Sequence, residues 1–306
     1  MVSALDSSLP DGAVVRRVLE LFLDHPECPF SVHAITSLGA RYGVRPGDWF
    51  APTPLCRVLR DICMRCQPAG LRAYCARDGA VYRDELVAMH QQAPVAHGTS
   101  SAEEACLAAA RAVAQTASAA AAAQGAFAVL VPVRLGVGAT VHAPYAAMLA
   151  ALFRVPQFIG IVGGRPHSSL FFFAAQGDNL YYLNPHYVQQ AVPHPQDPSD
   201  IDITVCVSLH LIHFHILLFT FVLFFLKQKQ SYVATRVMKM PVAAMDPSMA
   251  FGFLFQSMAD FDSFRQSFEA NDSINELFSI ADESPCGTSS NAPTASKSVL
   301  TNIPEA

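Results

Sequence analysis

One stretch of about 22 residues, 205–226, carries no charged side chain and is almost entirely apolar. As a helix it would be roughly 33 Å long, which is enough to cross the hydrocarbon core of a bilayer. Its three histidines, His210, His213 and His215, argue against a membrane span because polar groups are costly in lipid. Their spacing matches no usual metal site, so we interpret the histidines as coincidental.

A retained intron or another insertion explains this stretch best. Valine codons begin with GT, pyrimidine-rich codons encode Phe, Leu, Ile and Ser, and Gln can be encoded by CAG. An intron translated from Val205 to Gln230 would therefore produce a sequence of this kind. A membrane anchor and a buried helix remain open as alternatives, since apolar runs of about 18 or more residues usually span a membrane.

The composition of the whole chain is that of a folded protein. Apolar residues make up 52% of the 306 residues, which excludes disorder throughout and suits one large domain or two small ones. The net charge of −5 gives no overall reason to bind nucleic acid. The eight cysteines are too sparse for a disulfide scaffold, and residues 1–15 lack the features of a signal peptide. We therefore expect a reducing, cytoplasmic setting.

Hydrophobic periodicity and apolar runs predict a mixture of helices and strands. Ser31 is a candidate N-cap for one of the helices. Helices are expected at 14–23, 31–42, 55–66, 144–153 and 258–268. Strands are expected at 127–133 (central in a sheet), at 169–175 and 180–183 (a hairpin around a Gly-containing turn) and at 246–255, with a loop at 160–166. The alanine-rich stretch 102–124 is expected to be a surface helix or a low-complexity insertion.

Few residues suggest chemistry by themselves. Asn184-Pro185-His186 follows the second hairpin strand and places an amide beside an imidazole. Histidine is the usual general base of thiol catalysis, and a neighbouring oxygen can fix its tautomer, although a histidine at a strand end is more often structural. The pair Cys63 and Cys66 could be half of a zinc site or a redox pair, but ordinary helix cysteines are the better interpretation. The glycines at 160–164 lack a phosphate-binding lysine.

Six blocks, taken in order, resemble the autophagin family of autophagy cysteine proteases. They are Ser31-Val-His-Ala34, Gly47-Asp-Trp-Phe-Ala-Pro-Thr53, Val131-Pro-Val-Arg-Leu-Gly136, Val155-Pro-Gln-Phe-Ile-Gly-Ile-Val-Gly-Gly-Arg-Pro166, Gln176-Gly-Asp-Asn-Leu-Tyr-Tyr-Leu-Asn-Pro-His-Tyr-Val-Gln189 and Ala244-Met-Asp-Pro-Ser-Met-Ala-Phe-Gly252. The resemblance covers about residues 13–190 and 234–265. It implies a papain-like α/β (α+β) fold with no cofactor and no metal. It also implies cleavage after the C-terminal glycine of a ubiquitin-like autophagy modifier (ATG-eight type), and release of that modifier from phosphatidylethanolamine.

The resemblance also assigns roles to particular residues. It places His186 on the catalytic histidine of the family and Asn184 on the family's aspartate. It places Trp49, together with Arg165, Pro166, His167 and Ser168, on the loops that close over the glycine tail of the modifier. This assignment makes physical sense, because an aromatic ring opposed by a proline forms a slot that only a residue without a side chain fits comfortably.

Two departures from the family pattern stand out. The nucleophile of the family lies in a Trp-Gly-Cys block, which this sequence does not contain, and the matching position would fall before Met1. Asn184 can orient the imidazole but cannot stabilise imidazolium by charge. Without a thiolate no covalent catalysis is expected, since neither the histidine nor the asparagine can replace the sulfur.

We therefore expect a papain-like protease domain at residues 1–270 that is incomplete at its N-terminus. It would carry insertions at about 102–124 and 205–230 and would be followed by a disordered tail at 271–306. Transient contact with membranes that bear phosphatidylethanolamine is implied, but not contact with nucleic acid. The alternatives are a catalytically inactive, modifier-binding homologue and a membrane-tethered variant.

Overall fold

A computed structural model of the chain describes residues 21–67, 70–92, 125–186 and 237–285. Most of the predicted first helix, the alanine-rich stretch 102–124 and the apolar stretch 205–230 with its three histidines lie outside these residues. Among the helices that the structure does describe, none combines the length and the apolar character that a membrane span requires. Residues 21–23, the end of the predicted first helix, form a buried turn instead of a helix.

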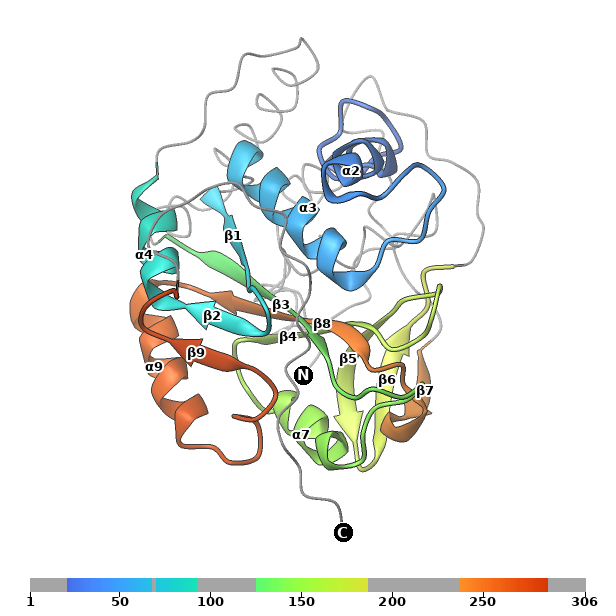
Figure 1. The fold of residues 1–306 in the computed structure, drawn as a ribbon, viewed down its shortest axis with the longest axis vertical. Coiled ribbons are helices and arrows are strands. Elements are labelled where there is room, and N and C mark those ends of the chain that lie inside the picture. The colour runs from blue at the N-terminus through green and yellow to red at the C-terminus, as the bar shows by residue number, and fades with distance from the viewer. Residues whose placement is uncertain (1–20, 68–69, 93–124, 187–236, 286–306) are drawn as a thin grey trace, which may run out of the picture.

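The described chain forms a mixed sheet flanked by helices, so the predicted α+β class is confirmed (Figure 1). In spatial order the seven-stranded sheet consists of β1 (Arg72–Cys75), β3 (Phe127–Arg134), β8 (Ser248–Phe255), β4 (Phe158–Gly163), β5 (Leu170–Gln176), β6 (Asn179–Leu183) and β7 (Met238–Pro241). The pair β1–β3 is parallel and the other neighbours are antiparallel. A separate parallel pair joins β2 (Ala80–Tyr82) to β9 (Ser279–Ala281).

The structure contains the helices predicted at 31–42, 55–66, 144–153 and 258–268, with small shifts of their ends, and others that the sequence did not predict. They are α2 (Val32–Gly39), η2 (Ala40–Tyr42), α3 (Pro52–Cys66), α4 (Arg83–Gln91), α7 (Pro144–Leu152), η7 (Val242–Ala244) and α9 (Met258–Glu269). The predicted N-cap is confirmed, because the Ser31 hydroxyl accepts a hydrogen bond from the Ala34 N–H at 3.1 Å. Helix α3 begins three residues earlier than predicted, since proline is favourable in the first turn.

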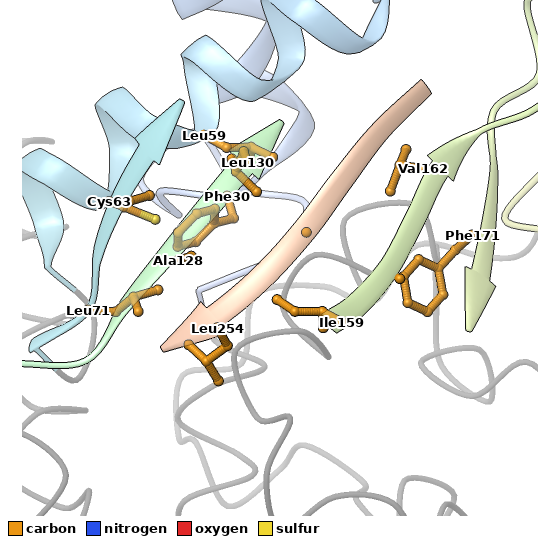
Figure 2. Close-up of a pocket in the computed structure, with 13 residues that line it drawn as sticks. Phe30, Leu59, Cys63, Leu71, Ala128, Leu130, Ile159, Val162, Phe171 and Leu254 are labelled. Atoms are coloured by element: carbon orange, nitrogen blue, oxygen red, sulfur yellow. The ribbon is translucent and has the colours of Figure 1, made fainter. Parts of the chain in front are cut away.

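The sheet is buried on both faces, because the side chains of each strand alternate between two separate cores. Along β3, Ala128 and Leu130 face the core beneath α2 and α3, whereas Phe127, Val129 and Val131 face the core beneath α7 and α9. The first face contains a small apolar cavity of about 50 Å³ between α3 and the strands (Figure 2). The long apolar run at 127–133 is thus a central strand, as predicted.

Residues 160–166 were expected to form a loop, but the structure places 160–163 in strand β4. The glycines at these positions allow neighbouring strands to come close to the β4 backbone, and they do not end the strand. A Cβ on Gly160 would lie 2.4 Å from the Phe172 carbonyl oxygen, and one on Gly163 would lie 2.7 Å from the Ser248 carbonyl oxygen. The neighbouring strands therefore leave no space for a side chain at these two positions.

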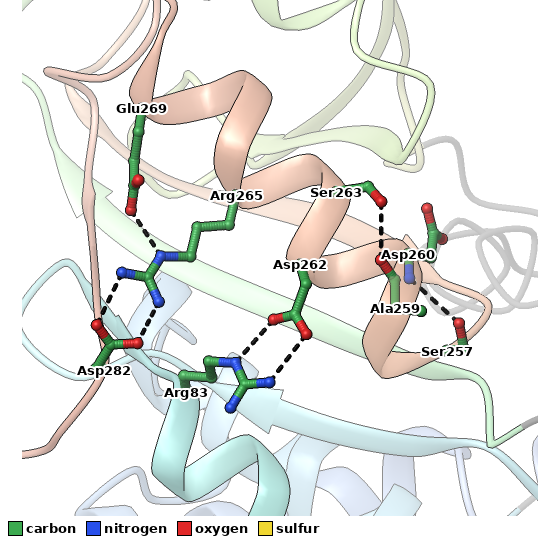
Figure 3. Close-up of polar contacts among 9 residues, drawn as sticks. All are labelled: Arg83, Ser257, Ala259, Asp260, Asp262, Ser263, Arg265, Glu269 and Asp282. Carbon is green, nitrogen blue, oxygen red and sulfur yellow. Dashed lines mark hydrogen bonds and ion pairs between the residues drawn. The ribbon is translucent and has the colours of Figure 1, made fainter.

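The prediction of a disordered tail from residue 271 onwards is wrong for residues 271–285, which are part of the fold. Ile274, Leu277 and Phe278 are buried in the core, and β9 then pairs with β2. Ion pairs hold this segment and α9 in place: Arg265 contacts Asp282 and Glu269, and Arg83 contacts Asp262 through two hydrogen bonds of 2.8 and 2.9 Å (Figure 3). Most residues of this stretch are polar, and only three of them enter the core. The sequence therefore suggested disorder.

Candidate active site at the edge of the sheet

His186 and Asn184 lie directly after β6 and are bonded to each other. The Asn184 Oδ1 accepts the His186 backbone N–H at 3.0 Å and lies 2.9 Å from the His186 Nδ1. A backbone N–H can only donate, so the atom that it contacts must be the amide oxygen, and the orientation of the Asn184 amide follows. An oxygen therefore faces Nδ1, which must carry the ring proton. The other nitrogen, Nε2, is left with a lone pair and is chemically suited to accept a proton.

The loop between β4 and β5 brings a hydroxyl to the same imidazole. The Ser168 Oγ lies 3.3 Å from the His186 Nδ1. Gly163 and Gly164, both with positive φ, turn the chain out of β4 into this loop. At Gly164 a Cβ would lie 2.6 Å from the Phe172 ring, so glycine is required there. Within the described residues, Ser168 and Asn184 are the hydrogen-bond partners of the His186 side chain.

A proline–glycine turn presents the only tryptophan of the chain. Arg45 to Asp48 form a turn closed by the Asp48 N–H donating to the Arg45 carbonyl at 3.0 Å, with Gly47 at φ +90°. Proline followed by a glycine of positive φ is typical of a type II turn. Trp49, which follows the turn and is 40% exposed, packs its ring against His167 with centroids 5.0 Å apart.

The structure thus brings most of the predicted site residues into one chain of contacts. Trp49 contacts His167, the adjacent Ser168 contacts His186, and His186 contacts Asn184. The aromatic ring that packs on Trp49 is that of His167, which follows Pro166 in the same loop. His167 has φ +53°, a left-handed conformation that is uncommon for residues other than glycine and is often found near functional sites.

The surroundings of His186 favour its neutral form. Although the residue remains solvent-exposed, partial burial of the ring lowers the pKa of His186 below its usual value, and the positive charge of Arg165 lowers it further. Both effects disfavour imidazolium. Asn184 is uncharged and supplies no opposing attraction. A neutral imidazole with an available Nε2 is the state that a general base requires.

Cys56 and Cys63 on α3 and Cys75 on β1 are buried in the core. Burial raises the pKa of Cys63 to about 12, so its sulfur stays a thiol at neutral pH. Cys63 lines the cavity beneath α3 (Figure 2), and its other lining residues are apolar or glycine. That cavity lacks the convergent polar groups of a substrate site. The interpretation of Cys63 as an ordinary helix cysteine agrees with this burial.

No local sequence pattern predicts the contact between Ser168 and His186. The hairpin turn pairs Gln176 with Asn179, and an uninterrupted register would place Ser169 opposite His186. A bulge between Phe172 and Ala174 shifts the register by one residue, so that Phe171 pairs with Leu183. The pairing ends at Phe171 and Leu183, so the contact between Ser168 and His186 is made by the loops beyond the paired strands.

Comparison with known proteins identifies relatives of the chain. Residues 6–267 match the family model of the peptidase C54 catalytic domain. A probable cysteine protease ATG4 of Pichia angusta is 29% identical over 88% of this chain and 45% of its own length. A probable cysteine protease ATG4 of Phaeosphaeria nodorum is 35% identical over 58% of this chain and 33% of its own length. The cysteine protease atg4da of Danio rerio is 29% identical over 84% of this chain and 42% of its own length.

The fold and these matches together define a domain of the cysteine protease class, with an α+β architecture consistent with the papain-like fold. The chain belongs to the peptidase C54 family. The resemblance inferred from the six sequence blocks is thereby confirmed. The chain spans about half the length or less of the curated relatives that it matches.

Proposed function

We propose that this chain carries the histidine, the asparagine and the substrate-tail loops of an autophagy cysteine protease. The substrate is a ubiquitin-like autophagy modifier, which the protease cleaves after its C-terminal glycine and releases from phosphatidylethanolamine. His186 acts as general base through Nε2, Asn184 orients it, and Trp49 with residues 165–168 holds the glycine tail. The protein works in the cytoplasm, with transient contact with membranes that bear the conjugated lipid.

One observation carries this proposal above the others. Asn184 presents its oxygen, and not its amide nitrogen, to Nδ1, and this orientation leaves Nε2 unprotonated. Thiol catalysis needs this tautomer, because the base must accept a proton from sulfur. The contact between Trp49 and His167 supports the assignment of the tail site, since it places an exposed aromatic ring beside the histidine loop.

The first test is hydrolysis of a modifier precursor by the purified chain. The sequence contains no Trp-Gly-Cys segment, so we expect no peptide-bond cleavage by this polypeptide. Measurable turnover that His186→Ala abolishes would show that another sulfur serves as the nucleophile, and the expectation of an inactive polypeptide would then be wrong.

A second proposed function is that of a modifier-binding homologue without catalysis. Immobilised modifier that ends in its glycine tail should capture the chain, and Trp49→Ala should weaken capture about tenfold or more, as expected for a central aromatic contact. Val32→Ala is a matched control, because Val32 is similarly exposed, at 46%, but lies on α2 outside the site. Capture that is insensitive to Trp49→Ala would contradict the proposed tail site.

A membrane-tethered variant remains the third candidate, and it depends on residues 205–226. Carbonate extraction of the expressed protein would leave an anchored chain in the membrane fraction and release a peripheral one. A transcript without codons 205–230 would instead support the retained intron.

A further inference from the structure

We propose that Ser168 is a positioning residue for His186, acting as a second hydrogen-bond acceptor for the proton on Nδ1. This inference rests on the proposed role of His186 as general base. It goes further in that Ser168 acts on the histidine, in addition to any contact with the glycine tail of the modifier.

The hydrogen-bonding capacity of Asn184 is the first step of the argument. Its Oδ1 receives two N–H donors, and both come from His186. Two donors use both lone pairs of an amide oxygen. The hydrogen bond from the His186 backbone N–H holds the Asn184 amide in its orientation. The Asn184 oxygen therefore supplies one acceptor for the proton on Nδ1, and a second acceptor must come from another residue.

The geometry of Ser168 supplies the other acceptor. The Ser168 Oγ lies 3.3 Å from Nδ1, compared with 2.9 Å for the Asn184 Oδ1, so the Nδ1 proton is shared unequally between the two oxygens. Because Nδ1 already carries a proton, the Ser168 hydroxyl hydrogen must point elsewhere, and its oxygen accepts. Two acceptors that approach from different loops resist ring rotation better than one acceptor does.

The neutral Asn184 makes the second acceptor useful. When Nε2 takes up a proton, the ring becomes positively charged and Nδ1–H becomes a stronger donor. Among the residues that the structure describes, no carboxylate is bonded to the ring, and Arg165 opposes the new positive charge. The oxygen of Ser168 therefore stabilises imidazolium at the point where Asn184 supplies no charge.

The location of Ser168 explains how the protein fixes this contact. Ser168 lies in the turn that follows β4, where its backbone N–H donates to the Arg165 carbonyl oxygen at 3.4 Å, while its neighbour Ser169 is buried and only 7% exposed. On the other side, His167 is held by the ring of Trp49. The same loop that faces the proposed substrate tail thus contributes the second acceptor.

Nitrogen-15 NMR of the full chain with labelled histidine tests the proposal without any substrate. The wild type should show a His186 ring protonated on Nδ1. Ser168→Ala should increase the fraction of the Nε2–H tautomer and reduce the proton affinity of the ring about threefold, which lowers the pKa of His186. Ser168→Thr keeps the hydroxyl and should restore both properties. Ser169→Ala is the matched control and should leave His186 unchanged.

Each outcome decides the proposal, provided that the amide spectrum shows an intact fold. A His186 titration in Ser168→Ala that equals that of the wild type would overturn it, and so would failure of Ser168→Thr to restore the tautomer. The proposed function fails separately, through loss of modifier binding by the wild type, and that result would leave the tautomer measurement unaffected.

Discussion

The two faces of the central sheet are packed in different ways. The face beneath α7 and α9, here the aromatic face, is filled by phenylalanine rings in mutual contact: Phe127, Phe158, Phe251, Phe253, Phe255, Phe261, Phe264, Phe268 and Phe278. The face beneath α2 and α3, here the cavity face, has small residues such as Ala128, Gly160 and Gly252 around a cavity of about 50 Å³. One sheet therefore combines a tightly interlocked core with a core that retains free space.

This difference predicts how each face responds to a change in side-chain volume. Interlocked rings cannot relax around a removed or an added group, so both kinds of change should destabilise the aromatic face. The cavity face can accept added atoms, because they enter existing space and gain contacts there.

The largest effect is expected for Phe253→Ala. The Phe253 ring lies 5.2–5.5 Å from the rings of Phe158, Phe264 and Phe278, and the side chain is 1% exposed. Removing it should lower the free energy of unfolding by about 3–5 kcal/mol, measured by urea denaturation. Phe173→Ala, on the partly buried edge of the cavity face, is the comparison and should cost less. Equal losses would break the distinction between the faces.

An intermediate effect is expected for Val129→Leu. Val129 is 2% exposed and faces the aromatic side of β3. The added methylene has no free space and should destabilise the protein by about 1–3 kcal/mol. A shift of the urea midpoint at an unchanged slope would measure this loss, whereas a stabilised variant would show that the aromatic face has room.

A smaller effect of the opposite sign is expected for Ala128→Val. Ala128 is the neighbour of Val129 on the same strand, but it lines the cavity. The added methyl groups should fill part of the cavity and stabilise the protein by up to about 1 kcal/mol. Thermal unfolding of both variants in parallel tests the pair. Destabilisation by Ala128→Val would mean that the cavity cannot accept a larger side chain.

The smallest effect is expected at the candidate active site, where the measured quantity is the pKa of His186 and packing in the two cores plays no part. Arg165→Ala removes a positive charge near His186 and should raise its pKa towards the usual value of 6.5. Because the pKa of His186 is lowered in the folded state, the unfolded chain binds the proton more tightly. The contribution of His186 to stability is therefore lost as the pH falls from above 6.5 to below the lowered value.

An NMR pH titration of the His186 ring measures this shift. Arg41→Ala, which removes a positive charge on η2, is the control and should leave the titration unchanged. An unchanged pKa in Arg165→Ala would assign the whole shift to burial.

Local signals in the sequence predicted most individual elements. The Ser31 cap, the hairpin of β5 and β6 and the helix α9 depend on neighbouring residues, and all three are present. Residues 160–163 of β4 were predicted to be a loop because of their glycines. These glycines are needed because the carbonyl oxygens of neighbouring strands come too close for a side chain, and no local pattern reveals this approach. The segment 271–285 was mistaken for a tail because the ring contacts of Phe278 are made with β8 and α9.

By itself, the sequence determined the family, the central strand and the position of His186 and Asn184 after a hairpin strand. Those properties follow from side-chain order along the chain and from hydrogen bonds that span two or three residues. Only the tertiary structure decided that the Ser168 hydroxyl meets His186 and that the ring of His167 packs on Trp49. The reason is geometric: these contacts join the loop after β4 to residues on two other loops, and the left-handed backbone at His167 lies within that loop, so no local pattern specifies them.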